Sequence, residues 1–70
     1  MARIKDKGSY FEIRYEGTTL RVNKNSGQVM DTKAALMKSD VGIIVSALSI
    51  SGYKELADKV ANRYRGKLPD

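Results

Sequence analysis

The hydrophobic pattern changes its period once along this chain. In the first half, large apolar side chains at Phe11, Ile13 and Tyr15 alternate with charged ones, and this period of two is typical of strands with one buried face. The second half follows helical spacing instead. We therefore expect an α+β fold in a single domain, residues 1–70. A small antiparallel sheet of three or four strands comes first, at about residues 3–30, and packs against two or three C-terminal helices.

The register of the first hairpin follows from the same pattern. Leu20 and Val22 must share a face with the first apolar set, so the loop must hold an even number of residues. A two-residue turn at Glu16-Gly17 satisfies this condition and sets Glu12 against Arg21 as an ion pair on the outer face. Because glutamate is a poor type I′ turn residue, a four-residue loop of the same parity stays open.

Two more strands are expected beside this hairpin. The segment from Lys24 to Gln28 suits a three-residue loop in which Gly27 adopts the left-handed conformation of a bulge. A short strand from Gln28 to Met30 follows that loop. Before the hairpin, residues 3–7 form a short edge strand that ends at Gly8-Ser9.

Two helices are predicted after the sheet. The first covers about residues 32–50 and has a cap at Asp31-Thr32, while Ser39-Asp40 offers a second cap that would divide it into a short and a longer helix. The second helix covers about residues 52–65 and has one regular apolar face. It ends before Gly66 and Pro69.

The first predicted helix is apolar on two sides. One stripe contains Ile44 and Leu48, and a second contains Ile43, Ala47 and Ile50. A small sheet covers only one such stripe, and exposed apolar patches favour association. The second stripe is therefore the predicted interface of a homodimer.

The residue types present disfavour side-chain catalysis on chemical grounds. The chain contains neither cysteine nor histidine, which removes the common nucleophile–base pairs and the usual zinc ligands. Glu12 and Glu16 are too far apart along one strand to act as a glycosidase pair. We expect a protein that is not an enzyme and that takes no metal and no cofactor.

The formal net charge of +5 favours a polyanionic or acidic partner. Arginine and asparagine on the outer face of a strand ribbon can contact phosphates and base edges in a DNA groove. A second basic cluster lies at the end of the last helix, where cations also complement the helix dipole. The candidate nucleic-acid-binding residues are Lys5, Lys7, Arg14, Arg21 and Asn23 on the sheet and Arg63, Arg65 and Lys67 on the helix. Against this interpretation, an exposed sheet face must be polar in any case, and Glu12 and Glu16 would repel phosphates there.

The segment Gly8-Ser-Tyr-Phe-Glu-Ile-Arg-Tyr-Glu-Gly17, with Leu20-Arg-Val22 and Asp31-Thr-Lys-Ala-Ala-Leu36, resembles the N-terminal arm-binding domain of tyrosine recombinases. The resemblance covers about half of the chain and implies a three-stranded sheet that reads DNA, with a helix behind it. The sequence departs from that pattern in the loop from Asn23 to Gln28, in fewer basic residues on the strands and in a second long apolar helix.

These patterns favour a small nucleic-acid-binding accessory or regulatory protein, of a size common in phages and mobile elements. The alternative is a protein-binding inhibitor or adaptor, such as a phage factor that acts on a host or defence protein. The charged N-terminus lacks the apolar segment of a secretory signal, and the longest mainly apolar stretch is half the length of a membrane span. We therefore expect a cytoplasmic location and no membrane partner.

Overall fold

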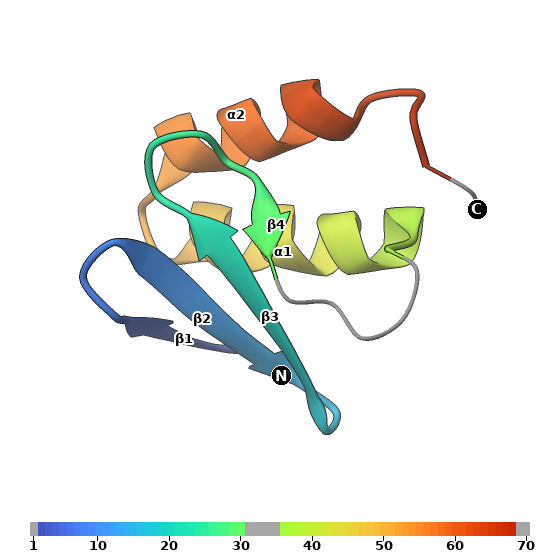
Figure 1. The fold of residues 1–70 in the computed structure, drawn as a ribbon. Helices are drawn as coiled ribbons and strands as arrows, with labels where there is room; N and C mark the ends of the chain where they lie inside the picture. The colour runs from blue at the N-terminus through green and yellow to red at the C-terminus, as the bar shows by residue number, and fades with distance from the viewer. Residues whose placement is uncertain (1, 31–35, 69–70) are drawn as a thin grey trace.

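The computed structural model describes residues 2–30 and 36–68 and confirms the α+β architecture (Figure 1). Four strands form one antiparallel sheet in the order β1-β2-β3-β4, and both helices lie on one side of it. The elements in chain order are β1 (Arg3–Asp6), β2 (Tyr10–Tyr15), β3 (Thr18–Asn23), β4 (Val29–Met30), α1 (Lys38–Ile50) and α2 (Lys54–Tyr64).

The first hairpin has the predicted register. Ile13 lies opposite Leu20, and Glu12 lies opposite Arg21. The turn has two residues, Glu16 and Gly17, with φ angles of 47° and 79°. Both central residues thus have the positive φ of a type I′ turn, whose twist matches that of the strands. The turn is type I′ even though its first central residue is Glu16, and glutamate is not favoured at that position.

The second hairpin corrects the predicted loop length. Val22 pairs with Val29, and the Asn23 backbone N–H donates to the Gln28 carbonyl across the loop. The loop between these two residues therefore holds four residues, 24–27, whereas the sequence pattern predicted three. The reason is parity: an odd loop would turn Val29 outward, whereas here it packs against the core. Gly27 has the expected positive φ, at 75°. The Oδ1 atom of Asn23 holds the loop by accepting hydrogen bonds from the backbone N–H groups of residues 25 and 26, at 2.8 and 2.9 Å.

Helix α1 begins at Lys38, so a continuous helix from residue 32 is wrong. Met37 has extended backbone angles, φ −118° and ψ 163°, and precedes the first turn. The carboxylate of Asp40 accepts a hydrogen bond from the Met37 backbone N–H at 3.0 Å. This bond satisfies a free donor at the helix start, so Asp40 acts from the third helical position and the N-cap is Met37 instead of the predicted Ser39-Asp40. The other predicted cap, Asp31-Thr32, lies outside the described residues. Helix α2 is confirmed to within two residues at each end.

The core lies between the sheet and the helices and takes side chains from both apolar stripes of α1. Ile44 and Leu48 are fully buried, Ala47 is nearly so, and Ile43 packs against the core. Ile50, in contrast, is 86% exposed. Ten residues form the buried cluster: Phe11, Ile13, Leu20, Val22, Ile44, Ala47, Leu48, Leu56, Ala57 and Val60. None of the helices in the described ranges is long and apolar enough to cross a membrane.

Candidate nucleic-acid interface

The candidate interface is the face of the sheet that is turned away from both helices, which we call the outer face. Residues that pair across strands share a face, so the pairs Lys5 with Glu12 and Arg3 with Arg14 place these four side chains together. The same rule places Thr19, Arg21, Tyr10 and Asn23 there. Among the described residues, four cationic side chains on three adjacent strands therefore share the outer face with one carboxylate.

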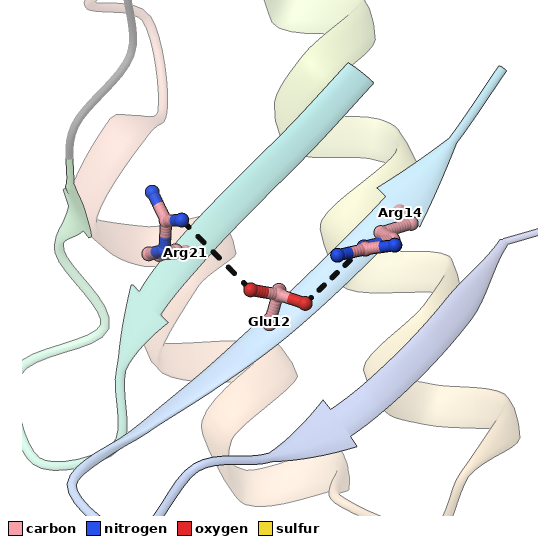
Figure 2. Close-up of polar contacts among 3 residues, drawn as sticks. All are labelled: Glu12, Arg14 and Arg21. Carbon is pink, nitrogen blue, oxygen red and sulfur yellow. Dashed lines mark hydrogen bonds and ion pairs between the residues drawn. The ribbon is translucent and has the colours of Figure 1, made fainter. Parts of the chain in front are cut away.

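That carboxylate, Glu12, is the most enclosed charged group in the described part of the chain, with 6% of its surface exposed. Its Oε1 atom lies 3.2 Å from Arg14 Nε, and its Oε2 atom lies 3.9 Å from Arg21 Nη2 (Figure 2). The predicted ion pair with Arg21 is thus confirmed, and Arg14 adds a second partner on the same strand. Two guanidinium groups balance one carboxylate, which removes much of the repulsion that Glu12 would exert on a phosphate.

The two arginines differ in how far they reach into solvent. The Arg14 side chain is 64% exposed, whereas that of Arg21 is 35% exposed. Arg14 therefore keeps most of its donors accessible while one of them binds Glu12. Figure 2 shows both guanidinium groups converging on the carboxylate from opposite sides, on the face of the sheet in front of the helices. A partner that approaches this face would meet fixed donors, since Glu12 restrains both side chains.

Two of the predicted sheet residues have other positions or tasks. Lys7 is exposed but lies beyond the end of β1, where its backbone N–H donates to the Tyr10 carbonyl at 2.9 Å. Asn23 lies on the outer face, and its side-chain oxygen is used by the β3–β4 loop. Its role in reading a base would therefore depend on the amide N–H groups alone.

Arg3 is a cationic residue of the outer face that sequence reasoning missed. Its cross-strand neighbour is Arg14, and its side chain is exposed. The signal was present in the sequence, because Arg3 alternates with Lys5 across Ile4, whose side chain packs against the core. With only one large apolar residue, the strand has a weak pattern.

The C-terminal basic cluster lies in the helical layer and does not join the outer face (Figure 1). Arg63, Arg65 and Lys67 are all exposed at the end of α2. The Arg65 guanidinium donates to Asn62 Oδ1 at 2.9 Å, and Arg63 lies in the last helical turn, where it complements the helix dipole. The structure therefore separates the three predicted helix residues from the predicted residues of the sheet.

Within residues 2–30 and 36–68, no three acidic side chains gather in a way that could hold a metal ion. Comparisons of this chain with protein families, curated proteins and solved structures found no match. The candidate interface therefore rests on the geometry of the outer face.

Proposed function

We propose that this protein binds duplex DNA through the outer face of its sheet, as a non-enzymatic accessory or regulatory protein that acts as a homodimer. One observation carries the proposal: four cationic side chains share the outer face with the enclosed carboxylate of Glu12, which two of them balance. The four are Arg3, Lys5, Arg14 and Arg21, and the two that pair with Glu12 are Arg14 and Arg21. The major groove of DNA is about 12 Å wide and admits a β-ribbon. Cations on such a ribbon release counterions from the phosphates, which supplies affinity.

The residues would divide the work by position. Arg14 and Arg21 lie on the two central strands, and arginine can bind the O6 and N7 atoms of guanine with two donors. Arg3 and Lys5 lie on the edge strand, where they would meet the phosphates that border the groove. Central residues would thus read bases while edge residues set the position of the sheet.

The test is a salt titration of binding to a random-sequence DNA duplex, followed by fluorescence anisotropy. Wild-type affinity should fall linearly with salt on a double logarithmic plot. Arg3→Ala or Lys5→Ala should each lower the slope by about 0.9, because one phosphate fewer is neutralised. Arg14→Ala should weaken binding, because it removes a residue that would contact the bases. Arg21→Ala should weaken binding as well, because it removes one cation and leaves Glu12 with one partner fewer.

Arg63→Ala and Arg65→Ala are the matched controls, since they make the same change of charge on the other basic surface. Both should bind like the wild type. If these two variants lose binding while the sheet variants keep it, the contact lies on α2 and the proposal is wrong. Circular dichroism should show that all variants are folded, because each of these side chains projects from the surface.

Glu12→Gln gives a second and opposite test of the same face. The amide removes the negative charge of Glu12 from the outer face and has nearly the same shape. Binding to the random duplex should therefore become tighter and more dependent on salt. Unchanged binding and an unchanged salt slope in a folded Glu12→Gln protein would show that DNA does not approach this face.

A protein-binding inhibitor or adaptor is the second candidate because, in the described part of the chain, three large apolar side chains are exposed. Met37, Tyr53 and Ile50 have 40%, 41% and 86% of their surface exposed. A partner bound mainly through such groups would give an affinity that hardly changes with salt. The same titration therefore separates the two candidates once a host or defence protein is used as the partner.

A further inference from the structure

A groove runs between α1 and the nearby ends of β1 and β2, and the described residues that line it carry no charged side chain. Its volume is about 610 Å³. Its lining comprises Ala2, Tyr15, Ser39, Gly42, Ile43, Ser46, Ala47, Ile50 and Ser51. Thirty per cent of the residues in this chain are charged, yet none of those in residues 2–30 and 36–68 lines this groove. The groove therefore favours a partner that needs no ion pairs.

One row of residues on α1 gives this surface a protruding side chain at one end, which we call the knob, and an open space at the other end, which we call the notch. Gly42, Ser46 and Ile50 follow one another at intervals of four residues and so form a single ridge of the helix. Ile50, at one end of the ridge, is 86% exposed. Gly42, at the other end, has open space where a side chain would lie, with nothing within 4 Å of an ideal Cβ position. Ser46 is small and lies midway between them.

We infer that a second copy of this chain binds here, with a two-fold axis beside Ser46. Such an axis places the two α1 helices in opposite directions, so that each Ile50 lies over the partner copy's Gly42 notch. Equal spacing on both sides of Ser46 makes the surface complementary to itself, as a two-fold interface requires. Small residues at two of the three positions allow the helix backbones to come close.

The charge distribution favours a second copy over an anionic partner at this place. Each copy carries a formal charge of +5, so two copies repel each other through most of their surfaces. At the groove they meet through uncharged side chains. Among the lining residues that the structure describes, a polyanion would find no cation to pair with.

The interface does not rest on the proposed DNA binding. The groove lies on the helical side of the sheet, and the outer face with Glu12 and its two arginines lies on the opposite side (Figures 1 and 2). A dimer would therefore leave both outer faces uncovered. Loss of dimerisation and loss of DNA binding can be measured separately on the same variants.

Single-cysteine variants test the axis directly because the native chain contains no cysteine. Under mild oxidation, Ser46→Cys should form a disulfide-linked dimer, since the two Ser46 positions face each other at the axis. A mixture of Gly42→Cys and Ile50→Cys should give the mixed disulfide in preference to either homodimer. Asn62→Cys on the exposed side of α2 is the control and should stay monomeric. Equal cross-linking of Asn62→Cys and Ser46→Cys would overturn the inference.

Sedimentation of uncross-linked protein tests the knob and the notch. At about 100 μM, wild-type protein with a dimer constant of ~1 μM is nearly all dimeric. Ile50→Lys and Gly42→Leu should both be folded monomers, the first by removing the knob and the second by filling the notch. Ile44→Lys should instead unfold the chain, because Ile44 is fully buried. A wild-type protein that is monomeric at this concentration would contradict the binding of a second copy in the groove. So would variants Ile50→Lys and Gly42→Leu that dimerise as well as the wild type. In either case the partner of the groove would be a different protein.

Discussion

The hydroxyl oxygen of Tyr64 accepts a hydrogen bond of 2.8 Å from the backbone N–H of Val29. The bond joins the end of α2 to β4, a strand of only two residues at the edge of the sheet. An N–H on the outer side of an edge strand has no partner within the sheet. Tyr64 supplies that partner, so the last helix helps to hold the shortest strand in place.

Tyr64→Phe should therefore lower the free energy of unfolding by about 1 kcal/mol, because it removes the acceptor and leaves a half-buried N–H unpaired. The measurement is the midpoint of urea denaturation with an unchanged slope. Tyr10→Phe is the matched control: Tyr10 lies on the outer face, and no described residue makes a hydrogen bond with its hydroxyl. An equal loss in both variants would mean that the bond to Val29 contributes nothing.

Two glycines with similar backbone angles should respond differently to alanine. Gly17 and Gly27 have φ angles of 79° and 75°, and alanine at such angles costs about 1–2 kcal/mol. A Cβ at Gly17 meets nothing within 4 Å, but one at Gly27 would lie 3.2 Å from the backbone nitrogen of Val60 in α2. Gly27→Ala should thus lose a further ~1 kcal/mol from overpacking. Thermal or urea unfolding of the two variants side by side measures the difference, and equal losses would rule out a close approach of the loop to α2.

Glu16→Asn should stabilise the protein. Glu16 is the non-glycine residue with positive φ in the described ranges, at 47°, and it occupies the first central position of the type I′ turn. Asparagine tolerates this conformation, so the exchange should gain about 1 kcal/mol and raise the melting temperature by ~4–8 °C in a domain of this size. Glu16→Gln serves as the control because it removes the charge and keeps the unfavourable angle. A similar rise in both variants would assign the gain to charge.

The pKa of Asp6 should depend on Lys24. The Lys24 Nζ atom lies 2.6 Å from Asp6 Oδ1, and this hydrogen bond, helped by the Gly8 backbone N–H, holds the pKa of Asp6 below its ordinary value of 3.8. Stabilisation from the depressed pKa is present above pH 3.8 and is lost as the pH falls through the folded-state pKa. Lys24→Met should raise the Asp6 pKa toward 3.8 in an NMR titration, and the two proteins should converge in stability at lower pH.

The distant Lys67→Met variant controls for the change in overall charge. It should leave the Asp6 pKa unchanged. A comparable rise in Lys67→Met would show that the general field of the protein, and not the contact with Lys24, determines the pKa. Methionine keeps much of the Lys24 stem, whose Nζ lies 4.6 Å from the centre of the Phe11 ring, so packing there is largely preserved.

Local rules predicted the sheet well. Alternation and the parity of the turn sufficed to pair Glu12 with Arg21, because both depend on nearest neighbours in one hairpin. The same parity argument applied to Val22 and Val29 would have predicted the four-residue loop, but turn preferences around Gly27 suggested three. The start of α1 was predicted less well, because Asp40 acts on the Met37 backbone N–H from inside the helix, and local cap preferences favoured a polar residue at the cap itself.

The remaining features depend on contacts that a local pattern does not contain. Tyr64 and Val29 are 35 residues apart, and nothing in the helical pattern of α2 distinguishes a tyrosine that bonds a strand from one that only packs. For the candidate interface, the sequence indicated Arg14 and Arg21 as outward-facing residues. It did not predict that Arg14 would turn toward Glu12 on its own strand, since that depends on the conformation of two long side chains.

The strand order β1-β2-β3-β4 has a consequence for how the chain folds. Each strand pairs with the next one in the sequence, across connections of only a few residues, so little entropy is lost in closing each loop. Topologies built from such nearby pairings fold faster than those that join distant segments. During synthesis, each strand of this sheet can meet its partner as soon as the following strand has left the ribosome. Only the covering of the apolar face must wait for the two helices.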